Sequence, residues 1–461
     1  MPYFTRSGRL QSSRSIGHVP IVENELISAR LQDFRVFNPE AEVGISPKLI
    51  VCADALALPG EPVRWVMSFD GSPQEVAVRE RYPSTRIGYI QIAGVLVHLE
   101  EMLRQGKEQF VDPAVIRKAT QEALHSMVLP GSNVCRQDMA TVKDSWRAEV
   151  YEIFRDYRVE DSSLLDVYML LVGYSDKRSP GGGVIVARCP AAASCKIGDI
   201  EVPVDGTTCP GCGGRVFPTD ALRIHEEVSE EHGNATALGR LMTCLEHITI
   251  VAYLHFLARR LPRALGIVAF ILDGPLTLFG PQAWLHSPIL AFIHDLYRVL
   301  AEDNKKSPVI IGIEKSGQFA EHADAIGDRI KPGCLMMLPD KYIYDHILTF
   351  RSSSSAAFGR DTYYGQKFFY KTARGQLLTI TVPKTNKDTA SPHDPREYEL
   401  LPDALALLDR VGTALYKDAV IPIALAHNYA SIPLRTGSKV LKLLAQGQLG
   451  VNQEDGEGVE R

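Results

Sequence analysis

The chain has 461 residues, of which 45% are hydrophobic and 23% are charged, and its formal net charge is −5. This is an ordinary globular composition, so a mainly disordered chain is excluded and the apolar material for a core is ample. A globally basic protein is also excluded, so any contact with nucleic acid has to come from a local basic surface. The eight cysteines are too few for a disulfide scaffold.

Neither a secretion signal nor a membrane span is expected. Residues 1–18 are basic and Ser-rich but lack an apolar core segment, which a secretory signal needs. The longest apolar runs, such as residues 264–272, are far below the ~18 residues of a membrane-spanning helix. We therefore expect a cytoplasmic protein that does not contact a membrane.

Periodicity and turn signals predict a series of elements along the chain. In chain order they are helical stretches within 1–60, strands at 62–69 and 86–98, helices between 110 and 180, a cysteine-rich segment at 185–220, a helix at 235–260, a strand at 264–272, a helix at 284–303, a strand at 308–316, a helix at 318–330, a strand at the end of 351–383, and helices near 396–411, 423–430 and 435–445. Antiparallel strands come first and alternating helices and strands follow, which predicts an α/β domain with a mixed sheet.

The cysteine-rich segment has the spacing of a metal site. Cys189 and Cys195 are followed, after thirteen residues, by the Cys-x2-Cys pair Cys209 and Cys212. Four thiolates satisfy tetrahedral zinc and leave no open position, so we expect a structural Zn²⁺ whose binding supplies the folding energy of a small segment. The alternative is four unrelated thiols in a loop. The other cysteines, at positions 52, 135, 244 and 334, are expected to be buried free thiols.

Three carboxylates form a candidate divalent-metal site. Asp70 and Asp273 each follow an apolar run and precede a glycine, and ligand sites in α/β sheets gather at such strand ends. Taken alone, either Asp-Gly pair is a turn signal. Glu246 lies inside the helix that precedes the second strand, where it is either exposed or faces inward. Together these oxygen ligands suit Mg²⁺ or Mn²⁺, and two such ions can cleave a phosphodiester bond.

The sequence resembles the NurA family of nucleases. The stretches that carry the resemblance are FDGS at 69–72, the helix around Glu246, LDGPL at 272–276, IGIEKSG at 311–317 and IPIALAHNYASI at 421–432. Each motif is short, but their order and the placement of the acids on strand, helix and strand extend over most of the chain. The resemblance implies a ribonuclease H-like mixed sheet flanked by helices. The zinc segment lies outside the family pattern, and we interpret this zinc ribbon and the helices before it as insertions. It also implies a manganese-dependent nuclease that acts on DNA, forms a homodimer and works with a HerA-type hexameric ATPase.

Carried over by position, the resemblance assigns Asp70, Glu246 and Asp273 to the metal and His427 to the active site, where the histidine would bind a metal or stabilise charge on the leaving group. Two assignments stay open. The long interval between Glu246 and Asp273 leaves Glu230 or Glu231 as the alternative glutamate, and Tyr416 is close to, but out of register with, a tyrosine that the family often has before the histidine.

The resemblance and the element order suggest a division of the chain. It comprises a leader at 1–60 that docks a partner, the first part of the nuclease core at 61–110, a helical insertion at 111–184, a zinc ribbon at 185–222, the rest of the core at 223–448 and a disordered acidic tail at 449–461.

The best candidate for a DNA-binding surface is the segment from residue 360 to 374, where basic and aromatic residues alternate. Positive side chains follow phosphates, and aromatic rings stack on unpaired bases. The candidate contacts are Arg360, Tyr363, Tyr364, Lys367 and Lys371. We expect Lys315, which follows the apolar run of the strand at 308–316, to reach the same cleft. The alternative is a strand with one apolar and one solvated face.

The sequence therefore predicts a divalent-metal-dependent DNA nuclease, an exonuclease that also acts on single strands, in DNA-end processing or antiviral defence. A second hypothesis is a non-catalytic, zinc-containing adaptor that binds DNA or the ATPase. A third, an unrelated zinc-ribbon enzyme, has no phosphate-loop, Ser-His-Asp or dinucleotide motif in its favour.

Overall fold

The computed structural model describes residues 3–4, 10–11, 19–34, 45–79, 82–105, 120–348, 357–385, 393–413, 420–432 and 436–449. They form two compact units, one from the described residues within 1–44 and 341–354, the other from those within 45–340 and 355–461. The smaller unit contains β1 (Tyr3–Phe4) paired with β2 (Leu10–Gln11), and the helices α1 (Val19–Val22) and α2 (Glu25–Gln32). The acidic segment at 450–461 and Tyr416 lie outside the described residues.

The larger unit contains all the candidate site residues. Its sheet strands are β3 (Ile50–Cys52), β4 (Trp65–Ala77), β5 (Arg86–His98), β6 (Thr120–Pro130), β13 (Val268–Asp273), β14 (Val309–Glu314), β15 (Cys334–Met337), β16 (Gly365–Lys371) and β17 (Leu377–Pro383). Its helices are α3 (Leu99–Gln105), α5 (Val142–Asp156), α6 (Leu164–Gly173), α7 (Ala235–Arg260), α8 (His286–Glu302), α9 (Gln318–Ile326), α11 (Leu401–Val411), α12 (Ile421–Ala430) and α13 (Thr436–Gln448), and the short α10 (Asp340–Tyr342) leads into the other unit.

One nine-stranded mixed sheet organises this unit, in the order β3-β15-β16-β17-β14-β13-β4-β5-β6. β13 runs parallel to both β4 and β14, and the other neighbouring pairs are antiparallel. Since β13 is fully buried up to its last residue, its near-continuous apolar sequence is that of a central strand. The predicted mixed α/β sheet flanked by helices is therefore confirmed.

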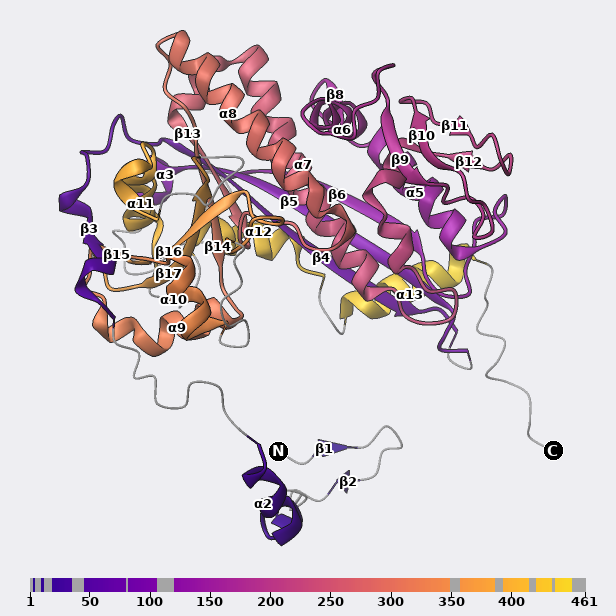
Figure 1. The fold of residues 1–461 in the computed structure, drawn as a ribbon, viewed down its shortest axis with the longest axis horizontal. Helices are drawn as coiled ribbons and strands as arrows, with labels where there is room; N and C mark the ends of the chain where they lie inside the picture. The colour runs from indigo at the N-terminus through magenta and orange to yellow at the C-terminus, as the bar shows by residue number, and fades with distance from the viewer. Residues whose placement is uncertain are drawn as a thin grey trace. The chain divides into compact units, whose positions relative to one another are not determined.

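Helices cover both faces of the sheet (Figure 1). On one face α7 packs against β4 and β5, and α5, α6 and α8 extend the same apolar core. On the other face α12 packs against β4 and β5, and α11 against β14. Alternate residues of β4 serve the two cores, with Phe69 on the α7 side and Val66 on the α12 side. The central strands are thus fixed from both sides.

Helix α7 is the core helix of this arrangement. Among the described residues it is the one helix long and apolar enough to cross a membrane, but most of it is buried inside the fold. Its bounds, and those of β5, coincide with the predicted helix at 235–260 and the predicted strand at 86–98. Leu261 and Pro262 end the helix, as expected.

Two predictions of local structure are wrong. The strand expected to end before Asp70 continues to Ala77, because β4 remains paired with β5 after β13 has left its other side. Pro73 is tolerated there because that side no longer needs a backbone donor. Residues 120–130, expected to be helical, form β6. Their apolar residues are spaced as in a helix because Leu124 and Val128 are exposed on one face of the strand while Met127 and Leu129 are buried on the other.

Candidate metal and catalytic site

Strand register brings Asp70 and Asp273 together. Leu272 of β13 is paired with Phe69 of β4 in the last parallel pair, so the next residue on each strand is an aspartate. Both aspartates follow the alternation that points Ile271 toward the α12 core. Their carboxylate oxygens and a ring nitrogen of His427 all lie within 4.8 Å of one another. The site thus forms where β13 separates from β4.

Helix α12 delivers His427 to this point. The Ser68 hydroxyl donates to the Pro422 carbonyl at 2.7 Å, and the Gln91 amide donates to the Tyr429 carbonyl at 2.8 Å, so both ends of the helix are tied to the sheet. His427 Nδ1 lies 2.7 Å from Asp70 Oδ2. A carboxylate only accepts, so Nδ1 carries the proton and Nε2 is left available on a side chain that is 59% exposed.

Lys315 belongs to the same cluster. It follows β14, the strand beside β13, and its Nζ lies 2.5 Å from Asp273 Oδ2. Burial and the negative charge of Asp70 raise the pKa of Asp273, and the Lys315 ammonium partly offsets this shift. Lys315 was expected to reach the cleft of the 360–374 segment, and the structure instead pairs it with a carboxylate of the aspartate cluster.

Glu246 approaches the cluster from the opposite face of the sheet. It is buried on α7, and a Cβ added to Gly71 would lie 2.8 Å from Glu246 Oε1. The absence of a side chain at position 71 therefore leaves the space that the carboxylate needs. Burial, followed by the charges of Asp70 and Asp273, raises the pKa of Glu246 well above its usual value. The inward-facing alternative for this glutamate is the correct one.

The competing glutamates have other positions. Glu230 accepts hydrogen bonds from the backbone N–H groups of Val142 and Lys143, at 2.8 and 3.1 Å, and so caps the N-terminus of α5. Glu231 is exposed. Glu246 is therefore the glutamate that accompanies the two aspartates.

We expect Glu246→Gln to stabilise the protein in the absence of Mn²⁺ and Mg²⁺. The substitution removes a buried carboxylate whose charged form is disfavoured, which raises the free energy of unfolding at pH 8 by about 1 kcal/mol. Because the folded-state pKa lies above the unfolded value, stability of the unsubstituted chain falls as the pH rises past the unfolded pKa. The gain is therefore absent below about pH 4 and grows toward pH 8.

Urea denaturation from pH 4 to pH 8 measures this effect, with the exposed Glu231→Gln as the matched control. A Glu246→Gln protein that is less stable than the unsubstituted chain at pH 8 would contradict the buried position of this carboxylate.

The predicted basic and aromatic DNA-binding surface is largely wrong. Residues 365–371 form the interior strand β16, and Tyr363, Tyr364 and Lys367 are buried, so their side chains cannot stack on bases or follow phosphates. Lys367 Nζ pairs with the Glu314 carboxylate and lies over the Phe319 ring. Lys371 Nζ donates to the Gly327 carbonyl at 2.9 Å, and Arg360 alone of the five is exposed. The segment is a strand, as in the alternative, but without the expected solvated face, because Gly365 to Tyr370 are all buried.

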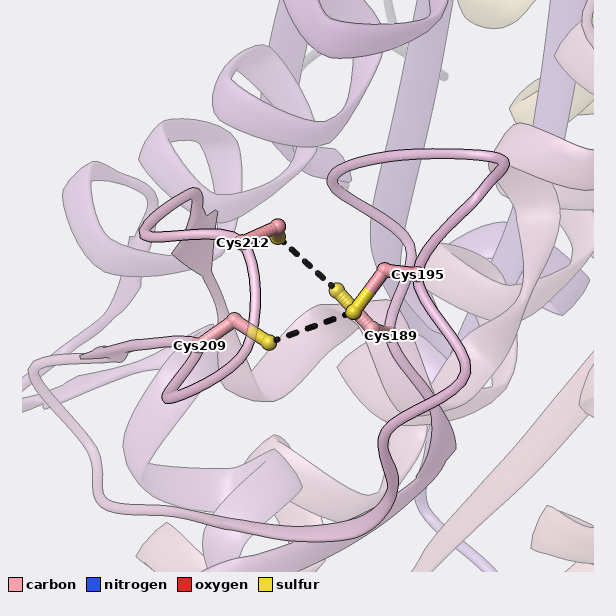
Figure 2. Close-up of side chains that lie close together, drawn as sticks. All are labelled: Cys189, Cys195, Cys209 and Cys212. Atoms are coloured by element: carbon pink, nitrogen blue, oxygen red, sulfur yellow. Dashed lines mark hydrogen bonds between the residues drawn. The ribbon is translucent and has the colours of Figure 1, made fainter.

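The four clustered cysteines converge (Figure 2). Cys189 Sγ lies 3.6 Å from Cys212 Sγ, and Cys195 Sγ lies 3.7 Å from Cys209 Sγ. Tetrahedral zinc with Zn–S bonds of ~2.3 Å separates its sulfurs by about 3.8 Å, so the cluster has the dimensions of such a site. Backbone N–H groups of Cys212 and Gly211 lower the pKa of Cys209 to about 6, which favours the thiolate that a metal binds.

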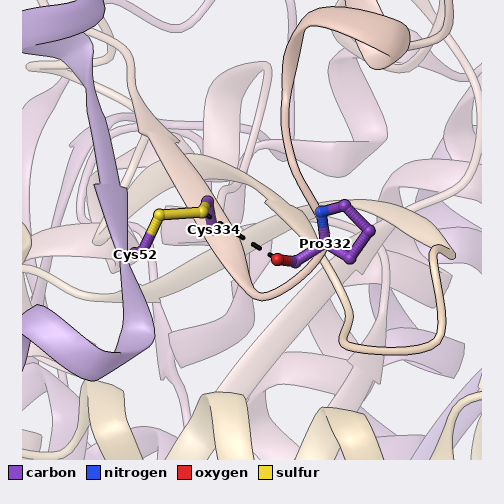
Figure 3. Close-up of a disulfide and its surroundings, with 3 residues drawn as sticks. All are labelled: Cys52, Pro332 and Cys334. Atoms are coloured by element: carbon purple, nitrogen blue, oxygen red, sulfur yellow. Dashed lines mark hydrogen bonds between the residues drawn. A yellow bond between two sulfur atoms is a disulfide. The ribbon is translucent and has the colours of Figure 1, made fainter.

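The remaining cysteines depart from expectation. Cys52 and Cys334 stand opposite each other on β3 and β15 and form a disulfide, with the Cys334 sulfur also 3.9 Å from the Pro332 carbonyl oxygen (Figure 3). Cys135 is exposed, and Cys244 alone is the buried free thiol that was predicted. A pair separated by 282 residues leaves no local sequence signal, so only the sheet register reveals it.

The fold and site define an α/β protein in which two strand aspartates, a helix glutamate, a lysine and a histidine converge at one point of a mixed sheet. Oxygen-rich donors of this kind suit a hard divalent cation. The positioning contacts of Ser68, Gln91 and Gly71 were not predicted, because each becomes visible only when α12 or α7 is placed on the sheet.

Similar solved structures include the NurA nuclease from Sulfolobus solfataricus, at 9% identity, with 95% of this chain and 98% of that chain covered and a TM-score of 0.37. They also include NurA bound to dAMP and manganese, at 12% identity, 95% and 98% coverage and a TM-score of 0.29, and a further NurA structure, at 11% identity, 96% and 98% coverage and a TM-score of 0.30. These are structures of the family that the sequence motifs resemble. No family model and no curated protein matches the chain. The role of each side chain therefore rests on the geometry described above.

Proposed function

We propose that this protein is a divalent-metal-dependent nuclease that hydrolyses phosphodiester bonds in DNA. The observation that carries the proposal is the convergence of Asp70, Asp273 and His427 within 4.8 Å, with the buried Glu246 behind them. Burial, followed by the charge of Asp70, raises the pKa of both Asp273 and Glu246, and a divalent cation bound there would offset this effect. Titratable groups with shifted pKa values that gather at one point mark a candidate functional site.

The donor set fits Mn²⁺ or Mg²⁺. Asp70, Asp273 and Glu246 offer carboxylate oxygens, the ligands that these cations prefer. When bound, the cation would activate a water for attack on phosphorus and stabilise the developing negative charge. Lys315 Nζ lies 2.5 Å from Asp273 Oδ2. When a cation binds Asp273 in its place, this ammonium group would be available to bind a phosphate of the DNA.

His427 serves the reaction from the solvent side of the site. Asp70 holds its Nδ1, which fixes the ring and leaves Nε2 pointing away from the carboxylate. In this neutral tautomer the Nε2 lone pair can serve as a metal ligand; when the ring is protonated on both nitrogens, it can instead give the Nε2 proton to the leaving oxygen or stabilise its charge. The residue therefore links the carboxylate cluster to the DNA that enters from solvent.

We also propose that the four cysteines bind a structural Zn²⁺, on the strength of their sulfur separations. The resemblance to NurA supports three further proposals: exonuclease action with activity on single strands, a homodimeric state, and partnership with a HerA-type hexameric ATPase in DNA-end processing or antiviral defence. A cytoplasmic location accords with these roles.

A nuclease assay tests the main proposal. DNA labelled at the 5′ or 3′ end, in single- and double-stranded form, is incubated with the full chain in Mn²⁺, in Mg²⁺ and in EDTA. We expect cleavage in the presence of the cations and none in EDTA, and the label that is released first reports polarity. DNA binding that needs no divalent ion, with no cleavage even when the ATPase is added, would favour the non-catalytic adaptor instead.

A further inference from the structure

Tyr364 lies between the two elements that carry Glu246 and Asp273. Its backbone N–H donates to the Leu276 carbonyl at 3.1 Å, three residues after Asp273. Its side-chain hydroxyl lies 2.6 Å from Nδ1 of His247, the residue after Glu246. One residue therefore contacts both the segment that leaves β13 and the helix α7.

The segment after Asp273 is held in place by backbone contacts to the residues around Tyr364. Thr277 is bridged to Tyr363, and the Leu278 N–H donates to the Thr362 carbonyl at 3.0 Å. Residues 276–278 are thus fastened to residues 362–365, which lead directly into β16. A displacement of Tyr364 would carry the end of β13, and with it Asp273, away from its present position relative to α7.

The contact between Tyr364 and His247 is isolated from water. Both side chains are 2% exposed, and their rings meet edge to face with centroids 5.4 Å apart. The tyrosine hydroxyl and His247 Nδ1 form a buried hydrogen bond at 2.6 Å, whose donor is set by the tautomer of the ring.

We propose that Tyr364 is a positioning residue that sets the spacing between the Glu246 and Asp273 carboxylates for a divalent cation. It acts through His247 on one side and through the Leu276 carbonyl on the other. This inference rests on the proposed function, because it assigns a partner outside the ligand set to the same metal site. It also replaces the role of base stacking that the sequence pattern suggested for Tyr364.

The test measures Mn²⁺ binding by the full chain, with Mn²⁺ alone as the probe and the free ion counted by electron paramagnetic resonance. Outer partners of metal ligands typically contribute 10- to 100-fold to metal affinity, so we expect Tyr364→Phe to weaken binding about tenfold. His247→Leu removes the ring nitrogen that is hydrogen-bonded to the Tyr364 hydroxyl, and it should weaken Mn²⁺ binding equally. The double variant should be no weaker than either single one, because both remove the same hydrogen bond. His247→Gln, whose amide oxygen can accept the bond, should restore most of the affinity.

The matched control is Tyr168→Phe. Tyr168 is fully buried in α6, and its hydroxyl donates to the Pro218 carbonyl at 3.0 Å, so the substitution also removes one buried hydrogen bond. It should lower the unfolding temperature without changing Mn²⁺ affinity.

Equal Mn²⁺ affinity in Tyr364→Phe and the unsubstituted chain, or additive losses in the double variant, would overturn the positioning role while leaving the proposed nuclease function standing. Absence of Mn²⁺ binding by the unsubstituted chain would overturn the proposed function itself, and this inference with it. If Tyr364→Phe does not fold, the comparison of His247→Leu with His247→Gln decides the question.

Discussion

Asp70→Asn and Asp273→Asn are each expected to reduce Mn²⁺-dependent cleavage of DNA by about 10³-fold or more while the chain still folds. Each substitution keeps the size of the side chain and removes one negative charge from a pair that strand register holds side by side. The fold should survive because burial already disfavours the charged form of Asp273. In Asp70→Asn, the new amide would keep an oxygen that accepts from His427.

Initial cleavage rates on end-labelled DNA measure the loss, and circular dichroism with thermal unfolding verifies the fold. Asp303→Asn is the matched control, since this aspartate is exposed after α8 and pairs with Lys305. Mn²⁺ binding should fall with activity in both site variants and stay unchanged in the control. Full activity in Asp70→Asn and Asp273→Asn would rule out the carboxylate pair as the cleavage site.

The reason both aspartates matter is the way the sheet is built. β4 and β13 are parallel and in register through Phe69 and Leu272, so their next residues must lie together wherever β13 ends. Helix α7 then approaches from the other face, over a glycine, with its glutamate. Three carboxylates distant in sequence are thus gathered at an electrostatic cost that a bound divalent cation would offset.

The main outline of this arrangement was predictable from local patterns. The 26-residue helix α7 has strong apolar content and a Leu-Pro stop, and β13 is a short apolar run before Asp-Gly, so both are determined by signals within their own segments. The same holds for the cysteine spacing. These signals each lie within one segment, so the sequence alone defines the segments, and the structure adds how they are placed relative to one another.

What could not be predicted depends on contacts between distant segments. The turn signal at Asp70-Gly71 was overridden because β5 keeps pairing with β4 along its whole length. The sequence pattern predicts a surface for the aromatic and basic side chains of β16, because sequence alone does not reveal that this strand lies inside the sheet with both of its faces buried. The Tyr364–His247 contact and the Cys52–Cys334 bond likewise join segments more than 100 residues apart.

The cysteine cluster leads to the second large effect, which concerns stability. We expect the purified chain to contain one Zn²⁺, and we expect Cys209→Ser combined with Cys212→Ser to abolish its binding. The loops that carry the sulfurs should then lose their structure. The hairpins β9 (Val184–Arg188) with β10 (Gly198–Val202) and β11 (Thr207–Thr208) with β12 (Arg215–Val216) should be less affected, because Val184, Val202 and Val216 are buried in the main core. Helices α5 and α7 should remain folded.

The helices are expected to survive because a separate contact anchors the end of this segment. The Arg147 guanidinium of α5 pairs with both carboxylate oxygens of Asp220, at 2.9 and 2.8 Å, and both side chains are almost fully buried. This bidentate pair is independent of the four sulfurs, so it should hold residue 220 in place after the zinc has gone. Loss of the metal is thus expected to unfold the ribbon locally rather than the whole chain.

Metal analysis by mass spectrometry measures zinc content, and hydrogen exchange along the chain locates the unfolding. Protection should disappear around the four cysteines, across residues 189–197 and 209–214, and persist in α5 and α7. Cys135→Ser is the matched control, since this exposed thiol lies outside the cluster and should leave both zinc content and exchange unchanged. Asp70→Asn should also keep its zinc, because the two sites share no residue. Unchanged zinc content in the double serine variant would show that the four cysteines do not form the metal site.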